Sequence, residues 1–405
     1  MFLKIILKMA VRNLLRNKRR SIAIVTTIGL GVCALFLYQG FNTGVMGTYK
    51  FNTIRSRYGH GQINTKDYRN KVYEKPWEHW IDNYSDVERE LLSDSRIQYI
   101  FPRVEFYAMI TNRKINVTAR GQGVIAENES RFFSALHLTN GENLSTQPDG
   151  LLIGYGLARA LDVKAGSRVT VMATTIFGSL NAIDFDVVGV FRSGTQEFDN
   201  TIFRIPLKQA HILLDTNKIE SVSLGLKDDD YWEDVINDFM PKFKNLEATS
   251  FAVLDKVFYQ NGTDFLRAQF NVVRIIILSI VILGIFNTIS TSIFERKQEI
   301  GNLRANGEST RDIIYLLVTE GMVIGAVSAI IGLLLAVFIV KFILFNGIIM
   351  PASPGFTHDF RVPITLMPFD ALETFLLGTL AATVGTYFAA LKVNKTTIAK
   401  LLRSY

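Results

Sequence analysis

The sequence predicts a membrane protein in which four transmembrane α-helices are combined with a large extracytoplasmic mixed α/β domain between spans 1 and 2. Apolar runs at 22–41, 275–294, 313–340 and 374–391 are each about long enough to cross a bilayer as a helix. The sequence between the first two runs is polar and contains short alternating segments, which are typical of a water-soluble domain. A mean hydropathy of +0.21 and 48% hydrophobic residues fit this combination.

A basic amphipathic segment at 1–21 precedes the first span. A lysine or arginine recurs every fourth residue from Lys4 to Arg16 with apolar residues between, as in a helix that lies in the membrane interface. The segment has no acidic residue, which predicts a cytoplasmic amino terminus. The span itself, assigned to 22–42, is too long for the core of a signal peptide and is predicted to be an uncleaved anchor.

Residues 43–269 are predicted to form the periplasmic α/β domain, with two subdomains and enough chain to bury its own core. Alternating apolar residues predict strands at 104–111 and 115–119, with Pro102 as a break before the first. Further strands are predicted at 168–173 and 185–191, and helices at 154–161, 207–214 and 231–243.

The rest of the chain completes the predicted bundle. With a cytoplasmic amino terminus, four spans place the carboxyl terminus in the cytoplasm and the α/β domain outside. The predicted segments are spans at 270–294, 313–341 and 370–391, a cytoplasmic coupling segment at 295–312, a proline-containing periplasmic loop at 342–369 and a cytoplasmic tail at 392–405.

Charge and motif content argue against several functions. The net charge of +7 arises beside the spans, at 1–21 and 392–405, so it does not indicate nucleic-acid binding. The sequence has no Gly-x-x-x-x-Gly-Lys-Ser/Thr phosphate loop and no His-x-x-x-His pair, so it predicts no ATP hydrolysis by this chain, no catalytic residue and no metal site. Asp228-Asp229-Asp230 lacks the spacing of calcium ligands and is interpreted as a solvated turn.

Two residues within the predicted spans, Cys33 and Glu320, have side chains that are unusual among the apolar residues around them. Cys33 is the single cysteine, so an intramolecular disulfide is excluded. Glu320 is costly inside a membrane unless it reaches the interface or a partner. It has two interpretations: a functional coupling role, or a residue near the headgroups that pairs with a basic side chain of segment 1–21.

The charged segment 295–312 lies between two spans and must therefore form a short connection at one face of the membrane. Ile300 and Leu303 are three residues apart, which places them on one face of a helix, and Gly307 is a predicted helix stop. From this pattern alone two interpretations remain open, a solvated connector and a small helix that docks into another protein.

The same stretch resembles the coupling segment of the FtsX-like family of ABC transporter permeases, which includes the MacB and LolC/LolE transporters. The family pattern reads Glu-Arg-x-x-Glu-Ile-Gly-x-Leu-Arg-Ala-x-Gly, and only Asn306 stands where an apolar residue is usual. The resemblance implies that this helix inserts into a groove of a separate ATPase dimer that binds ATP and magnesium, so no cofactor is expected in this chain. The implied coupling residues are Glu295, Arg296, Glu299, Ile300, Gly301, Leu303, Arg304, Ala305 and Gly307.

Elsewhere the chain is most similar to the lipoprotein-releasing LolC/LolE branch. Unlike the MacB branch, no ATPase is expected to be fused at the amino terminus. The resemblance implies a bacterial inner-membrane permease that pairs with a second copy or a related permease and passes lipoproteins to a periplasmic carrier or adaptor. The resemblance to this branch is carried by segments 59–63, 153–158, 163–170, 187–191 and 194–199, with Ser167 in place of the usual aspartate, while segments 13–21, 320–321 and 389–403 resemble the wider FtsX-like family.

Alternatives remain open both for the residues that line the substrate path and for the function of the protein. Phe36, Phe41 and Phe286 are candidates to line a lipoprotein path, and contact with membrane lipids is the alternative for each. MacB-like efflux of drugs, peptides or toxins is the second predicted function. A third is an FtsX-like regulator of a periplasmic hydrolase, although this α/β domain is larger than FtsX usually carries.

Overall fold

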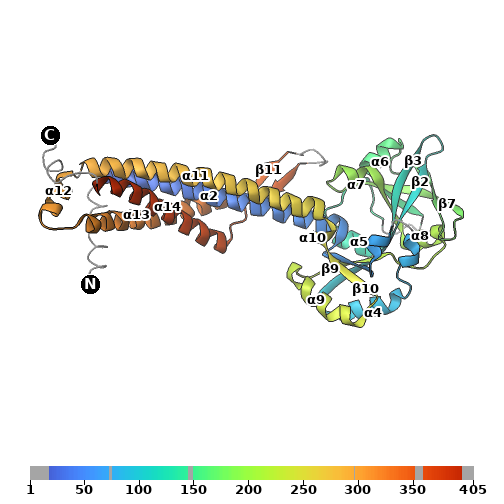
Figure 1. Cartoon of the computed structure of the whole chain (residues 1–405). Helices are drawn as coiled ribbons and strands as arrows, with labels where there is room; N and C mark the ends of the chain where they lie inside the picture. Colours follow the sequence, from blue (N-terminus) through green and yellow to red (C-terminus); the bar gives the residue numbers. More distant parts are fainter. Residues whose placement is uncertain (1–17, 73–74, 145–148, 296, 352–358, 395–405) are drawn as a thin grey trace. The chain divides into compact units, whose positions relative to one another are not determined.

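The computed structural model describes residues 18–72, 75–144, 149–295, 297–351 and 359–394 (Figure 1). The predicted interfacial helix at 1–21 and tail at 392–405 therefore lie almost wholly outside the described residues. The chain divides into two compact units: a helical unit, Met1–Gly47, Thr263–Ile349 and Arg361–Tyr405, and an α/β unit, Thr48–Gly262 and Met350–Phe360.

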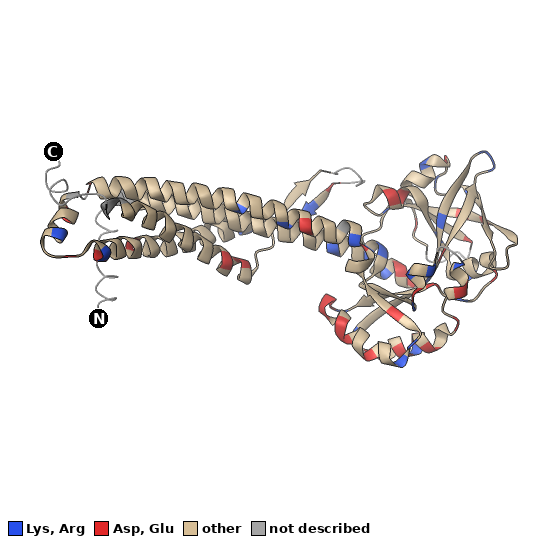
Figure 2. Cartoon of the chain, in the orientation of Figure 1, with Lys and Arg blue, Asp and Glu red and all other residues tan. Residues whose placement is uncertain are grey.

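Within the described residues, four helices are long and apolar enough to cross a membrane, which confirms the predicted fold class. Figure 2 shows these helices as almost wholly uncharged over most of their length. They are α2 (Lys18–Thr53), α11 (Asn261–Glu295), α13 (Thr310–Phe338) and α14 (Pro368–Asn394). Shorter elements between them are α12 (Lys297–Ala305), the π-helix η6 (Ile339–Ile343), β11 (Ile348–Met350) and β12 (Phe360–Val362).

Helices α2 and α11 continue well past the predicted spans at 22–42 and 270–294. The 36 residues of α2 correspond to about 54 Å of helix, whereas the hydrocarbon core of a bilayer is about 30 Å thick. The predicted borders marked the ends of apolar runs. Polar residues end such a run without ending the helix.

Small residues let the long helices approach closely. A Cβ atom on Gly332 of α13 would lie 2.4 Å from the carbonyl oxygen of Gly29 in α2, and one on Gly325 would lie 2.5 Å from the Cβ of Ala382 in α14. Side chains at these positions would push the backbones apart, so these small residues lie on the contact faces of the bundle.

The α/β unit is built on a ten-stranded sheet of order β10-β1-β9-β2-β3-β8-β5-β7-β4, with β6 pairing β2 and β7. Its strands are β1 (Gly61–Thr65), β2 (Ile97–Thr111), β3 (Asn116–Val124), β4 (His137–Gly141), β5 (Gly150–Gly154), β6 (Arg168–Thr174), β7 (Leu180–Arg192), β8 (Ile202–Pro206), β9 (Ser221–Leu226) and β10 (Leu246–Ser250).

Short helices surround this sheet. The predicted helices at 154–161 and 207–214 are present, and 231–243 forms a helix between two 3-10 turns. The α-helices are α3 (Tyr68–Lys71), α4 (Tyr84–Ser93), α5 (Ala126–Phe132), α6 (Tyr155–Ala160), α7 (Gln196–Thr201), α8 (Leu207–Leu214), α9 (Trp232–Phe239) and α10 (Phe251–Leu254). The 3-10 and π turns are η1 (Ile54–Tyr58), η2 (Pro76–His79), η3 (Asp229–Tyr231), η4 (Met240–Lys242) and η5 (Lys256–Gln260).

Strand β2 joins two lobes of the α/β unit (Figure 1). Its first half, up to Arg103, pairs with β9, and its second half, from Val104, pairs with β3 and later also with β6. The prediction that Pro102 breaks the strand is wrong, since β2 runs through it opposite Val222. A proline removes only one backbone donor, and here the strand changes partners directly after it.

A buried ion cluster lies beside this change of partners. Glu129 of α5 accepts hydrogen bonds from Arg103 of β2, Nε at 2.8 Å and Nη2 at 2.9 Å, and from Arg204 Nη1 of β8 at 3.1 Å. All three side chains are buried, with Arg103 fully inaccessible. Arg103 also donates to the carbonyl of Arg57 and Arg204 donates to that of Ser56, so the cluster fixes the π-helix η1.

One carboxylate thus holds two guanidinium groups in the interior. Burial lowers the pKa of Arg204 to about 10 and Glu129 opposes that shift, so Arg204 remains charged at neutral pH. Gln122 Oε1 accepts Arg204 Nε at 3.0 Å, and the ring of Phe133 lies 4.6 Å from the Arg103 guanidinium carbon. Removing the carboxylate would leave two buried cations without a counter-ion, which is far more costly than losing a surface pair.

Asp228-Asp229-Asp230 lies in an exposed turn, as predicted, and Asp229 also forms part of a second polar junction. The buried His60 accepts the N–H of Leu226 at Nδ1, 3.0 Å away, so Nε2 carries the proton and donates to Asp229 Oδ1 at 2.8 Å. Lys50 Nζ lies 2.8 Å from the other oxygen of Asp229. The hydrogen bond from His60 and the charge of Lys50 hold the pKa of Asp229 well below its usual range.

We expect Glu129→Gln to lower the free energy of unfolding of the α/β unit by about 3–5 kcal/mol, because two buried cations lose their counter-ion. Glu127→Gln, two residues away on α5, is the matched control, since Glu127 is exposed and pairs only with Arg131; we expect a change within about 0.5 kcal/mol. Urea-dependent hydrogen exchange of β2 and β8 amides in the full chain measures the change in unfolding free energy that each substitution causes. Equal effects of the two substitutions would contradict the role of Glu129 as the counter-ion of Arg103 and Arg204.

Candidate functional site

The predicted coupling segment contains a short amphipathic helix, α12, between α11 and α13. Ile300 is 4% exposed and Leu303 is partly buried, and both belong to the apolar cluster formed by the membrane-type helices, which includes Ile313 and Leu317 of α13. The predicted shared face of Ile300 and Leu303 is therefore the face by which α12 is anchored to its own chain.

The other face of α12 is open to solvent. Glu299, Asn302 and Ala305 are exposed and follow one another at intervals of three residues, so they lie on one side of the helix. Gly301 is buried next to Ile300, and Arg304 is intermediate. Of the predicted coupling residues, this arrangement exposes Glu299 and Ala305 on the outer face of α12, and it adds Asn302 to that face.

Two capping motifs set the end of α12 and the start of α13. Gly307 has φ +96°; its N–H donates to the carbonyl of Arg304, and the N–H of Glu308 donates to that of Leu303, which together form a Schellman motif. Ser309 then opens α13 with a capping box, in which Asp312 N–H donates to Ser309 Oγ and Ser309 N–H donates to the Asp312 carboxylate, each at 3.2 Å. The predicted helix stop at Gly307 is confirmed.

Sequence reasoning missed Asn302, Ser309 and Asp312. The signal for the capping box was present, because Ser-x-x-Asp directly before an apolar run is a helix-start pattern. Asn302 had no such signal, since its position on the solvent face depends on which side of α12 is anchored. Glu295 ends α11, Arg296 lies outside the described residues, and the docking roles of all these residues stay predictions.

The candidate path residues lie in different environments. Phe36 is 3% exposed and packs with Cys33 and Ala336, so the alternative of a lipid-facing Phe36 is wrong. Phe41 and Phe286 are partly buried. Their place on a substrate path stays a prediction.

Glu320 is buried inside the helical unit, at 5% exposure. The basic segment 1–17, which contains most of its predicted partners, lies outside the described residues. Next to it, a Cβ on Gly321 would lie 2.1 Å from Thr386 Oγ1 of α14, so Glu320 stands where α13 and α14 are in close contact. This position leaves both predicted roles for Glu320 open.

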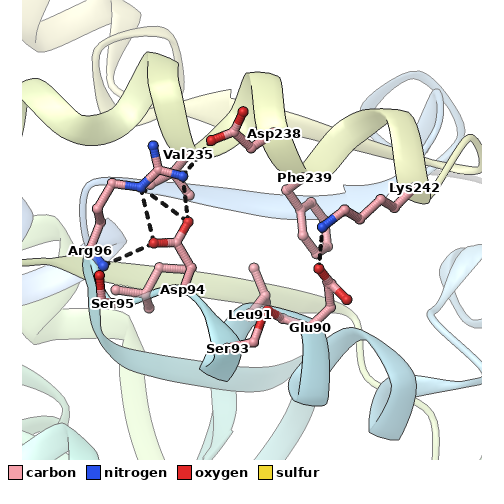
Figure 3. Close-up of a pocket in the computed structure, with 11 residues that line it drawn as sticks. Glu90, Leu91, Ser93, Asp94, Ser95, Arg96, Val235, Asp238, Phe239 and Lys242 are labelled. Atoms are coloured by element: carbon pink, nitrogen blue, oxygen red, sulfur yellow. Dashed lines mark hydrogen bonds and ion pairs between the residues drawn. The ribbon is translucent and has the colours of Figure 1, made fainter.

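The α/β unit has a pocket of ≈ 610 Å³ between the end of α4 and α9 (Figure 3). Its charged groups are paired with one another: Arg96 lies 2.6 Å from both Asp94 and Asp238, and Lys242 contacts Glu90. The hydrogen bonds from Arg96 lower the pKa of Asp94. The ion pairs of this pocket join the end of α4 to α9 and the turn that follows it. Its charged side chains are therefore already paired within the protein.

Comparison with protein families identifies the chain. The model of the MacB-like periplasmic core domain matches residues 21–240, which is more than half of the chain, and the model of the FtsX-like permease C-terminal region matches 271–398. The chain is an FtsX-like, MacB-type ABC transporter permease.

Individual relatives of the permease are distant. It is 21% identical over 273 residues to the lipoprotein-releasing system transmembrane protein LolE of Haemophilus influenzae, covering 64% of each chain. It is 22% identical over 356 residues to the macrolide export ATP-binding/permease protein MacB of Campylobacter jejuni, covering 82% of the permease and 53% of MacB. The permease thus spans 64% and 53% of the lengths of these relatives.

One solved structure is similar to part of the permease. The periplasmic region of MacB from Actinobacillus actinomycetemcomitans aligns with 49% of the permease and 91% of its own chain, with 13% identity and a TM-score of 0.38.

We expect Gly307→Ala to destabilise α12 by about 1 kcal/mol, because an L-residue is strained in the left-handed conformation that the Schellman motif requires. A Cβ on Gly307 would meet no atom within 4 Å, so the substitution tests backbone conformation alone. Hydrogen exchange of α12 amides in the full chain should accelerate about fivefold, whereas Asn306→Ala at the neighbouring exposed position leaves it unchanged. Unchanged exchange in Gly307→Ala would show that the cap does not hold α12.

Proposed function

We propose that the permease releases lipoproteins from the bacterial inner membrane, with its α/β unit in the periplasm and both termini in the cytoplasm. The observation that carries the proposal is the motif at 59–63, which resembles the LolC/LolE branch. His60 of this motif binds both Leu226 and Asp229, so the motif residues are tied to the core of the α/β unit. The similarity to LolE is in keeping with this cargo.

In this proposal α12 is the contact with a separate ATPase dimer that binds ATP and magnesium. Its exposed face, Glu299, Asn302 and Ala305, meets the ATPase, while Ile300 and Leu303 hold it to the apolar cluster shared with α13. Because one face of α12 is anchored, and its carboxyl end is joined through the Schellman motif to the capping box of α13, a displacement of α12 by the ATPase is transmitted to α13 instead of being absorbed by a loop. A second copy, or a related permease, supplies the other half of the transporter, and a periplasmic carrier or adaptor receives the cargo.

We expect Glu299→Lys to reduce co-purification of the ATPase at least about tenfold, because the substitution reverses a charge on the exposed face of α12 that forms the proposed contact. Glu308→Lys makes the same change of charge at an exposed position beyond the end of α12 and is expected to leave co-purification unchanged. Quantifying the ATPase retained on affinity-purified permease from native membranes measures both. Full retention by Glu299→Lys, with unchanged ATP hydrolysis, would exclude this face as the docking surface.

We expect depletion of the permease to raise the amount of lipoprotein in the inner membrane and to lower it in the outer membrane. The measurement is quantitative detection of lipoproteins in separated membranes, with an outer-membrane β-barrel protein as the control for membrane integrity. An unchanged lipoprotein distribution with a normal level of the control would exclude this cargo.

A MacB-like efflux function is the second candidate, favoured by the match of residues 21–240 to the MacB-like periplasmic core domain. Its substrates would be drugs, peptides or toxins, and co-purification of a periplasmic adaptor would support it. Co-purification of a periplasmic hydrolase would instead support an FtsX-like regulator. Loss of ATPase docking in Glu299→Lys is expected in all three cases, so the depletion experiment is the one that separates them.

A further inference from the structure

A second pocket of the α/β unit, of ≈ 340 Å³, has a different charge arrangement from the pocket at α4 and α9. It is lined by residues of η1, β1 and α3 together with residues of β2, β3 and β9, so it lies where the two lobes joined by β2 meet. Its volume falls in the range of sites for small molecules.

The acidic residues of this pocket are already bound by the chain itself. Glu105 Oε1 accepts Gln122 Nε2 at 2.6 Å, and its other oxygen lies 3.7 Å from Arg120 Nε. Glu220 accepts the Tyr68 hydroxyl at 2.6 Å and the backbone N–H of Glu105. Burial and the neighbouring Glu105 raise the pKa of Glu220, which lowers its negative charge near neutral pH.

The basic residues of the pocket are in the opposite situation. Arg57 and Arg69 both line it, and among the described residues no carboxylate lies within ion-pair distance of either guanidinium. Arg57 stacks over the ring of Tyr58 at 4.7 Å, which positions it without neutralising it. Arg57 and Arg69 therefore bring positive charge to the pocket without a direct carboxylate partner, and Asp255 and Glu247 act on them only at longer range.

Two buried polar atoms of the pocket also lack partners within the described chain. Asn64 is 3% exposed; its Nδ2 donates to the carbonyl of Glu220, but its Oδ1 has no donor. Arg120 Nε is buried without a hydrogen-bond acceptor. Buried polar atoms are ordinarily satisfied, so a missing acceptor and a missing donor in the lining of one pocket point to a bound molecule that supplies both.

We propose that this pocket binds a small organic acid that carries a carboxylate and an N–H or O–H donor, the chemistry of an amino acid or a hydroxy acid. The carboxylate pairs with Arg57 and Arg69 and accepts from Arg120 Nε, and the ligand's donor binds Asn64 Oδ1. Because the ligand bridges the lobes that share β2, its binding stabilises their arrangement. The site is separate from the proposed cargo and from the ATPase contact, so its test does not depend on either.

The experiment titrates the full-length permease in lipid nanodiscs with L-glutamate and with L-malate by isothermal calorimetry. Inorganic phosphate and glycerol serve as comparison compounds. At least one acid should saturate with a Kd below about 1 mM. In the same samples, hydrogen exchange should slow in residues 57–72 and in β9.

Substitutions locate the site. Arg57→Met and Arg69→Met keep the aliphatic part of each side chain and should weaken binding at least about tenfold, since each removes a charge-assisted hydrogen bond. Arg159→Met, an exposed arginine on α6 outside the pocket, is the matched control and should bind as the unaltered protein does. Arg69 is exposed on α3, so its replacement leaves the fold intact even if Arg57→Met does not fold.

Three results would overturn the proposal. One is the absence of saturation by either acid up to about 10 mM. Another is unchanged affinity in Arg69→Met. The third is saturation by inorganic phosphate alone, which would assign the arginines to a different class of anion.

Discussion

The α/β unit of the permease depends on one buried carboxylate. Glu129 neutralises Arg103 and Arg204, and these two arginines in turn hold the backbone carbonyls of η1. The cluster lies next to the residue at which β2 exchanges one set of neighbours for another. A charge of this kind is costly to bury and more costly to leave unpaired, so helix α5, strands β2 and β8 and the turn η1 are coupled in their stability.

The sequence predicted those features that are set by local rules or by the bilayer. Long apolar runs identified four spans, since only a helix satisfies its backbone in hydrocarbon, and Gly307 ended α12 because of its backbone freedom. The Glu129 cluster could not be predicted from the sequence, because Arg103, Glu129 and Arg204 are brought together only by the pairing of distant strands. The ends of α2 and α11 were missed because apolarity, and not helicity, was the signal that marked them.

The coupling segment shows the same division between local and long-range information. Its helix, its stop and its apolar face followed from the spacing of Ile300, Leu303 and Gly307, and the family resemblance added a function. Which residues face solvent depended on the packing of α12 against the bundle, so Asn302 emerged only from the structure. The pocket of Arg57 and Asn64 likewise had no signature in the chain, because its walls come from seven separate elements: η1, β1, α3, β2, β3, β9 and α10.

The two back-to-back caps between α12 and α13 constrain how this protein can evolve. Only Glu308 separates Gly307 of the Schellman motif from Ser309 of the capping box, so the length of the connection is fixed. One inserted residue within α12 would turn its outer face by about 100°, away from any established contact. Under the proposed docking of α12 on an ATPase, recognition of a different ATPase would arise by amino-acid replacement at constant length, and insertions and deletions should be selected against in this connection.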